Sequence, residues 1–179
     1  MKMRKCIKGL VYGILIVCIL TGGLFLSYRR PFRDLVETYS NQYGLDSNLV
    51  YAVMKAESGY DSMAISKSGA KGLMQIMNKT GTWGAEECAI PDYANDRLFE
   101  PSINIQIGTW YLARLMKQYE GNLQLVLAAY NAGTGNVAKW RNNTLYSSDG
   151  NVLHTIPFKE TQKYIQKVSF YYKVYNLLY

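Results

Sequence analysis

Cysteine and histidine are scarce in this chain, and their scarcity excludes the usual ways of building a metal site. The 179 residues include three cysteines and a single histidine, His154. Cys88 is the only cysteine after residue 30, so residues 31–179 contain no pair that could form a disulfide. No other cysteine or histidine stands near Cys88 in the sequence, and we therefore expect no metal site. His154 lies in a polar stretch and is interpreted as a surface residue.

An excess of basic residues is also missing from most of the chain, although the formal net charge is +7. Residues 1–30 contain six lysines and arginines and no acidic residue. Residues 31–179 contain 14 basic and 13 acidic residues, which leaves a net charge of +1. A nucleic-acid-binding domain usually carries basic residues clustered on the folded part. The distribution of charge therefore argues against nucleic acid as a partner.

Charged residues are absent altogether from residues 9–28, a run of 20 residues. A helix of this length rises about 1.5 Å per residue and can cross a hydrocarbon core of roughly 30 Å. Four basic residues precede the run, which weakly favours a cytoplasmic N-terminus. We predict that residues 1–30 are a cytoplasmic stub and transmembrane anchor, and that residues 31–179 are one extracytoplasmic domain. The alternative is a cleaved signal peptide and a secreted domain.

Clean β-strand alternation is missing from residues 31–179, and helical patterns dominate instead. Pro101 suits the first turn of a long helix, and the apolar residues up to position 116 form one broad face. Gly108 lies in the middle of this helix, where it indicates close packing against a neighbour. The pattern predicts a mostly α domain with helices over residues 32–43, 46–58, 80–87, 101–119, 123–131 and 158–178, one further turn at 137–141, and room for a small hairpin within 61–76.

Glu57 is the residue whose surroundings suggest chemistry. It stands at the apolar end of a predicted helix and is followed by Ser58 and a glycine. Burial raises the pKa of a carboxyl group and keeps its proton available near neutral pH, as a general acid requires. Three further motifs follow along the chain, at residues 72–76 (GLMQI), 128–133 (AAYNAG) and 160–164 (ETQKY).

These four motifs, in this order, resemble the lytic transglycosylase domain of the SLT or goose-type-lysozyme-like superfamily, whose members cut the glycan strands of bacterial peptidoglycan. The resemblance extends from about residue 32 to the C-terminus. It implies a compact, mostly α, lysozyme-like fold and a monomeric domain that needs no cofactor. It also implies that Glu57 is the catalytic residue and that the substrate-binding residues are Ser58, Met74, Gln75, Tyr130, Asn131 and Tyr164.

The resemblance also suggests a role for most of these side chains. The hydroxyl of Ser58 is expected to hydrogen-bond locally, and Met74 is expected to provide an apolar floor beneath Glu57. Gln75 carries both donors and an acceptor and suits an N-acetyl amide or a sugar hydroxyl. Tyr130 and Asn131 are expected to face the cleft, and Tyr164 to contact the catalytic carboxyl group.

A single carboxylate is enough in the mechanism that the resemblance implies. Glu57 would protonate the bond between N-acetylmuramic acid and N-acetylglucosamine and then accept the proton of the muramic C6 hydroxyl, which leaves a 1,6-anhydro end. Hydrolytic glycosidases usually use two carboxylates. A hydrolytic muramidase on the same fold is therefore one alternative, and the second carboxylate would come from Asp61, Asp92 or Asp96.

Two further alternatives give the domain no chemistry of its own. One is a peptidoglycan-binding scaffold in an envelope machine, and the other is an anchored helical domain that docks partner proteins. An intact Glu57 argues against the scaffold, because binding alone does not require an acid there. In a docking domain the four ordered motifs would be a coincidence. The junction at residues 27–31 contains no glycine- or serine-rich linker. We therefore expect the domain to act on wall glycan close to the cytoplasmic membrane, alone or within an envelope complex.

Overall fold

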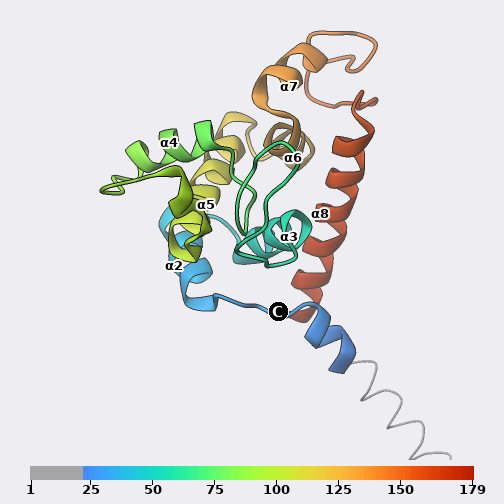
Figure 1. Ribbon diagram of the computed structural model, residues 1–179. Coiled ribbons are helices and arrows are strands. Elements are labelled where there is room, and N and C mark those ends of the chain that lie inside the picture. Colours follow the sequence, from blue (N-terminus) through green and yellow to red (C-terminus); the bar gives the residue numbers. More distant parts are fainter. Residues whose placement is uncertain (1–21) are drawn as a thin grey trace, which may run out of the picture. The chain divides into compact units, whose positions relative to one another are not determined.

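The computed structural model describes residues 22–179, and residues 32–177 form a compact unit of their own (Figure 1). Most of the predicted membrane span, residues 9–21, lies outside the described residues. Within the described residues, none of the helices has both the length and the apolar character needed to cross a membrane.

Helices make up the compact unit, as the sequence pattern predicts. They are α2 (Arg33–Tyr43), α3 (Ser47–Glu57), α4 (Asn78–Glu87), the 3-10 helix η1 (Asn95–Phe99), α5 (Pro101–Gln118), α6 (Leu123–Ala132), α7 (Thr134–Arg141) and α8 (Lys159–Leu178). The described residues contain no β-strand. The hairpin suggested for residues 61–76 is reduced to two isolated bridges, which pair Lys71 with Ile65 and with Ile76.

The helix ends follow from local chemistry that is visible in the sequence. The side chain of Asp46 accepts a hydrogen bond from the Asn48 amide at 2.8 Å and caps α3. Gly44 adopts a φ of 67° and ends α2, because glycine enters the left-handed region without steric cost. Two of the predicted helices were too short. Helix α4 begins two residues earlier than expected, and α7 has eight residues rather than one turn. The helix η1 was not predicted.

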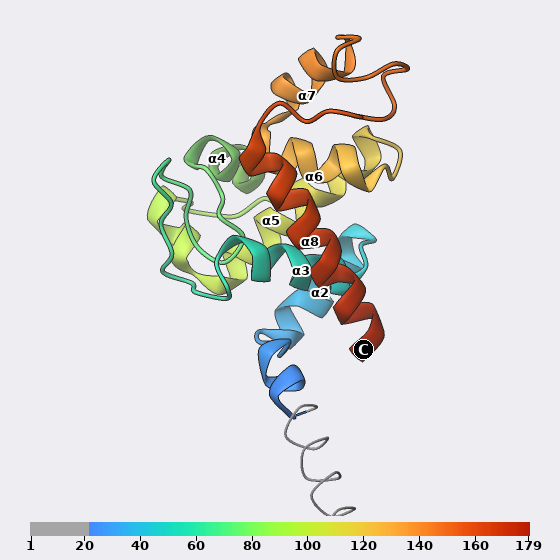
Figure 2. The same cartoon turned by 90° about the vertical axis from the view of Figure 1, so that its right-hand side faces the viewer.

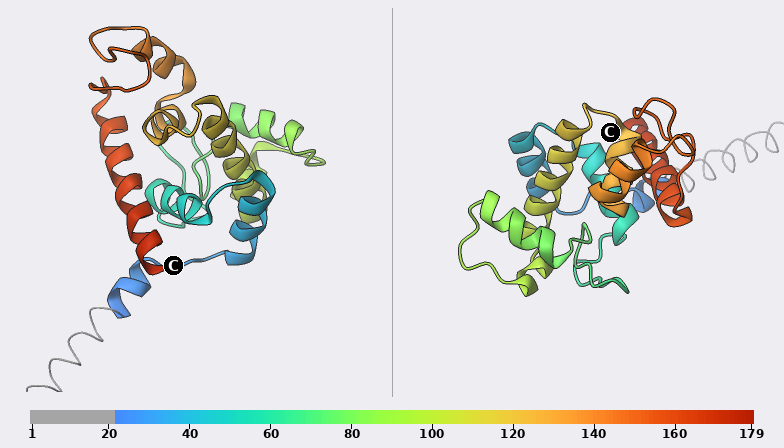
Figure 3. Two further views of the ribbon diagram at one scale, coloured as in Figure 1. Left: turned by 180° about the vertical axis from the view of Figure 1, so that it is seen from behind. Right: turned by 90° about the horizontal axis from the view of Figure 1, so that it is seen from above.

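Helix α3 lies at the centre of the unit, and α8 packs along it. Residues 49–54 of α3 are all buried. Figures 1 and 2 show α8 running past α3 and α6 in both views. The rings of Tyr51 and Tyr175 stack there with their centroids 5.7 Å apart. On the side away from α8, α2 packs against α5, as the view from behind in Figure 3 shows. The predicted surface residue His154 is exposed in the loop before α8.

Gly108 allows α5 to approach the loop that follows α3, as its place in the sequence suggests. A Cβ at position 108 would lie 2.8 Å from the Cβ of Met74, closer than two such carbons approach in proteins. Gly84 of α4 faces α5 in the same way, because a Cβ there would lie 3.2 Å from the Trp110 ring. Helix α5 is therefore the platform on which both α4 and the loop of residues 58–77 rest.

Candidate active site

Glu57 is the last residue of α3 and faces a cleft. The residue is half-buried, and burial raises the pKa of its carboxyl group to about 7. Two neighbours oppose this rise: the phenol of Tyr164, through a hydrogen-bonding interaction, and the positive charge of Lys167. The negative charge of Glu160 adds to it. Desolvation is the largest of these effects, so Glu57 is an acid that exchanges its proton near neutral pH.

Tyr164 faces Glu57 from α8. Its hydroxyl oxygen is buried, interacts electrostatically with the Glu57 carboxyl group and has no other hydrogen-bond partner among the described residues. Burial raises the pKa of Tyr164 well above its ordinary value, and the charge of Glu57 raises it further. The phenol therefore keeps its proton and can donate to the Glu57 carboxylate.

Lys167 and Ser58 fix the end of α3 on either side of Glu57. The Lys167 ammonium donates to the carbonyl oxygen of Ala56 at 2.7 Å, which suits a cation at the C-terminal end of a helix. The Ser58 hydroxyl donates to the carbonyl oxygen of Leu73 at 2.8 Å and accepts from the Tyr60 amide at 3.1 Å. Ser58 thus ties α3 to the motif at residues 72–76, and its hydroxyl bonds locally as the sequence suggests.

Gln75 lies on that motif in a conformation unusual for its type. Its φ is 49°, in the left-handed region that favours glycine. The side-chain nitrogen donates to the carbonyl oxygens of Ala64 at 3.1 Å and Gly72 at 2.9 Å. The loop therefore holds the nitrogen end of the Gln75 amide, so the loop fixes the direction in which the side chain extends.

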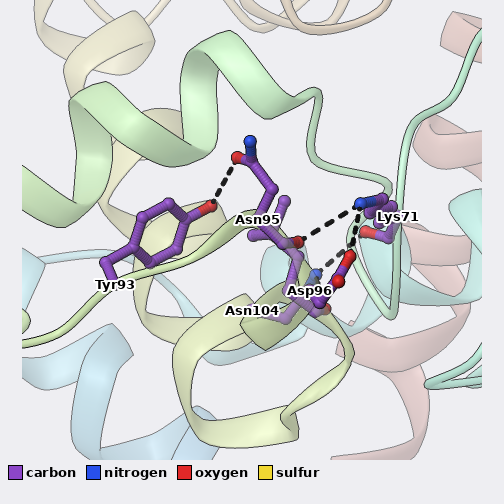
Figure 4. Close-up of polar contacts among 6 residues, drawn as sticks. Lys71, Tyr93, Asn95, Asp96 and Asn104 are labelled. Carbon is purple, nitrogen blue, oxygen red and sulfur yellow. Dashed lines mark hydrogen bonds and ion pairs between the residues drawn. The ribbon is translucent and has the colours of Figure 1, made fainter.

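Asn104 of α5 binds the backbone of the motif at residues 72–76 and of the residue before it, and its side chain is completely buried. Its oxygen accepts from the Met74 amide at 2.7 Å, and its nitrogen donates to the carbonyl oxygens of Lys71 at 2.9 Å and Leu98 at 2.7 Å. Figure 4 shows part of this network, together with the 3.1 Å ion pair between Lys71 and Asp96. One buried amide thus satisfies three backbone groups of two separate segments.

Met74 supports the site rather than lining it. Its side chain is fully buried and packs against α5 at Gly108. This placement differs from the expectation that Met74 binds substrate, because a side chain with no exposed surface does not touch a ligand. Its carbonyl oxygen accepts a hydrogen bond from the Tyr130 hydroxyl at 2.9 Å. The sequence marks Met74 as apolar and does not show on which side of the loop it points.

Tyr130 and Asn131 reach the cleft from the end of α6. Burial raises the pKa of Tyr130 well above its ordinary value, so its hydroxyl stays protonated and donates to Met74. The Asn131 oxygen accepts from the Thr161 hydroxyl at 2.7 Å, which links α6 to α8. Asn131 also lines the cleft.

The cleft consists of three adjoining sections with volumes of about 330, 450 and 340 Å³. The first two share Glu57, and all three share Gln75 and Asn131. Tyr130 lines the second and third sections, and Tyr164 lines the first. A separate cavity of about 250 Å³ around Tyr119 and Arg141 shares no residue with the cleft and contains none of the predicted site residues. Among the described residues, no three metal-ligating side chains gather at one place.

Glu160 is the cleft residue that the sequence interpretation missed. It lines the first two sections beside Glu57 and raises the pKa of that residue. Its place four residues before Tyr164, on the same face of a helix, was the available signal. Asp61, Asp92 and Asp96 line none of the three sections. Asp61 accepts from the Met63 amide at 2.8 Å, and Asp96 pairs with Lys71.

The raised pKa of Glu57 predicts a pH-dependent difference in stability between the wild type and Glu57→Gln. The carboxyl group titrates near 4.5 when unfolded and near 7 when folded, so between these values the folded state holds a proton that the unfolded state has lost. The resulting stabilisation is complete below pH 4.5 and disappears as the pH rises through 7. Denaturant unfolding from pH 4.5 to 8 should therefore show the wild type losing up to about 3 kcal/mol relative to the variant. A difference that stays constant with pH would contradict the shift.

Comparison with known protein families assigns the chain to a family, which the geometry of the cleft alone does not do. Residues 34–152 match the model of the transglycosylase SLT domain. The chain belongs to this family. The soluble lytic murein transglycosylase of Salmonella typhimurium is 36% identical over 147 residues, which cover 81% of this chain and 23% of that protein. The membrane-bound lytic murein transglycosylase C of Edwardsiella ictaluri is 32% identical over 171 residues, which cover 77% of this chain and 44% of that protein.

Solved structures of the SLT family share the fold. An inactive Glu-to-Gln variant of lytic transglycosylase Slt from Pseudomonas aeruginosa superposes with a TM-score of 0.77 at 34% identity, over 86% of this chain and 25% of that one. The 70 kDa soluble lytic transglycosylase of Escherichia coli gives 0.78 at 32% identity, over 91% and 27%. The predicted mostly α, lysozyme-like fold is thus confirmed. The chain spans less than half of the length of these relatives.

Proposed function

We propose that this SLT-family chain is a peptidoglycan lytic transglycosylase that cuts the β-1,4 bond between N-acetylmuramic acid and N-acetylglucosamine. The observation that carries the proposal is a carboxylic acid with a pKa of about 7 facing a cleft at the junction of α3, α6 and α8. Such an acid can donate a proton and later accept one at the same pH. Relatives named lytic murein transglycosylases support the choice of substrate.

Glu57 would act twice in one turnover. As an acid it protonates the glycosidic oxygen, so the bond to the muramic C1 breaks and the N-acetylglucosamine hydroxyl leaves. The 2-acetamido oxygen of the muramic residue stabilises the positive charge at C1. As a carboxylate, Glu57 then removes the proton of the C6 hydroxyl, and that oxygen bonds to C1. The enzyme returns to its starting state, and the product ends in 1,6-anhydromuramic acid.

The other cleft residues would hold the sugar and the acid in place. Gln75 and Asn131 offer amide groups to the N-acetyl and hydroxyl groups of the glycan, and the Tyr130 ring offers an apolar surface. The Tyr164 phenol would donate a hydrogen bond to the Glu57 side chain when Glu57 is ionised. Ser58 and Met74 would act as positioning residues, because their contacts are with the loop and α5 rather than with the cleft.

A hydrolytic muramidase is the second candidate, and the position of Glu160 favours it. A second carboxylate beside the acid is what water activation requires in a hydrolase. The two functions differ in their products: the transglycosylase leaves 1,6-anhydro ends, whereas the hydrolase leaves reducing ends. Mass spectrometry of fragments released from purified peptidoglycan separates the two, since an anhydro end is one water lighter. Reducing ends from the wild type would replace the transglycosylase by the hydrolase.

We also propose that residues 1–30 anchor the enzyme to the cytoplasmic membrane with the catalytic domain outside. The support is the uncharged run at residues 9–28 and a relative named as membrane-bound. The full chain should remain in the membrane pellet after alkaline extraction, whereas a chain beginning at residue 31 should be released. Recovery of a shortened mature chain in the soluble fraction would instead indicate a cleaved signal peptide.

A further inference from the structure

Lysines gather at the cleft of a domain that is otherwise nearly neutral. Residues 31–179 have a net charge of +1, yet three lysines line the first two sections of the cleft: Lys67, Lys163 and Lys167. The acidic residues that line the cleft are Glu57 and Glu160. Three lysines against two glutamates leave an excess of positive charge there even when Glu57 is ionised. The cleft thus attracts anions, although the sugars that it would hold are neutral.

The three lysines differ in the contacts that their side chains make within the protein. Lys167 donates to the Ala56 carbonyl oxygen and lies 5.9 Å from the centre of the Tyr171 ring. Lys163 precedes Lys167 by four residues on α8, so both project from the same face of the helix. Lys67 lies on the loop before Gly69, next to Ser66 and Ser68, which also line the cleft. Among the described residues, neither Lys163 nor Lys67 is within 4 Å of an acidic group.

We propose that Lys163, assisted by Lys67, recognises a carboxylate on the peptide stem of the muramic residue bound in the cleft. The proposal rests on the proposed function, since it takes peptidoglycan as the substrate. The repeating sugars carry no charge once the lactyl group is joined to a peptide, so the stem supplies the anionic groups of the strand. The flexible side chain of a lysine suits such a partner, because its ammonium group is a mobile point charge that needs no fixed geometry. Each of the two lysines lines a section of the cleft that also contains Glu57, so a muramic residue held at Glu57 brings its peptide stem near them.

Binding of three probes tests this assignment. The probes are glycan strands with their peptide stems, strands freed of stems by an amidase, and neutral chitooligosaccharides. Each is titrated against the full chain in mild detergent, with Glu57→Gln in every variant so that no strand is cut. The variants are Lys163→Gln, Lys163→Arg, Lys67→Gln and Lys173→Gln. Lys173 is the matched control, because it is an exposed lysine of α8 that lines no section of the cleft.

Lys163→Gln is expected to raise the Kd for stem-bearing strands about two- to fivefold, the range for an exposed ion pair. Lys67→Gln should have a smaller effect of the same kind, and Lys163→Arg should retain most of the affinity. The loss should shrink at high salt, because salt screens exposed charges. The Kd for chitooligosaccharides should change less than twofold in every variant, and Lys173→Gln should match the parent protein.

Three outcomes would overturn the inference. Equal losses of affinity for Lys163→Gln and Lys173→Gln would show that the general positive charge of α8, and not Lys163 in particular, attracts the strand. An equal loss with chitooligosaccharides would show a contact to the sugar rather than to an anion. A loss confined to stem-free strands would move the recognised carboxylate to the exposed lactyl group. The proposed function fails separately, if wild-type protein with Glu57 intact releases no anhydro ends from the same stem-bearing strands.

Discussion

Glu57→Gln is expected to reduce the rate at which the protein cuts peptidoglycan by about 100-fold to 10,000-fold, the usual contribution of a positioned acid–base group. The amide has nearly the shape of the carboxylic acid, so the cleft should keep its form and its affinity for glycan. It cannot give up a proton to the glycosidic oxygen or take one from the C6 hydroxyl, so both halves of the proposed reaction lose their proton carrier. Release of soluble muropeptides from purified peptidoglycan measures the effect.

Two matched variants show whether the loss belongs to the acid at this place. Glu87→Gln makes the same change on the exposed surface of α4 and should cut glycan at the wild-type rate. Glu160→Gln removes the other cleft carboxylate, and a single-acid mechanism tolerates that change far better than it tolerates Glu57→Gln. Folding of each variant is checked by circular dichroism. Cutting by folded Glu57→Gln at near the wild-type rate would remove Glu57 from the mechanism.

Asn104→Ala is expected to lower the free energy of unfolding by about 3–5 kcal/mol, a large effect for one substitution. The truncation leaves two backbone groups without their partner, the amide of Met74 and the carbonyl group of Leu98. The carbonyl group of Lys71 loses one of its two hydrogen bonds and keeps the bond from the Ile76 amide at 2.9 Å. Each of these groups is buried or half-buried, and a buried group without a partner costs about 1–3 kcal/mol. Urea denaturation measures the change.

Activity should fall together with stability in Asn104→Ala, even where the variant is still folded. The Met74 amide that Asn104 holds is adjacent to Gln75, and the Met74 carbonyl group orients Tyr130. Asn95→Ala is the control: its side chain takes part in the same region through one long 3.5 Å contact from Tyr93, so a loss below about 1 kcal/mol is expected. Equal stability losses in the two variants would contradict the bracing role of Asn104.

The sequence predicts those features of the fold that local chemistry determines. Asp46 and Gly44 mark helix ends through side-chain capping and a left-handed backbone, and both act within a few residues. The helix at residues 101–118 follows from its apolar face. The extent of α7 was underestimated because its small and polar residues show little periodicity. The 3-10 helix η1 is too short to leave any periodic pattern.

The sequence predicted some residues of the candidate site and missed others, for a different reason. Glu57, Gln75, Tyr130, Asn131 and Tyr164 all line the cleft, and four sequence motifs were enough to choose them. The direction of a side chain depends on tertiary packing, so the sequence names Met74 as an apolar floor among the substrate-binding residues without showing that its side chain is fully buried. For the same reason the second cleft carboxylate was sought at Asp61, Asp92 and Asp96, whereas the fold brings Glu160 of α8 to Glu57. Asn104 was not among the predicted site residues, and its three hydrogen bonds show how it braces the loop.

Digestion of purified peptidoglycan in isotopically labelled water tests the central claim most directly. In the proposed reaction the C6 hydroxyl of the muramic residue closes on C1, so no oxygen from water enters the new end. Mass spectrometry of the fragments should therefore show anhydromuramic ends without the heavy isotope, and Glu57→Gln should produce them at least about 100-fold more slowly. Reducing muramic ends that carry the heavy oxygen would contradict the account, because they would show that water, and not the C6 hydroxyl, attacks C1.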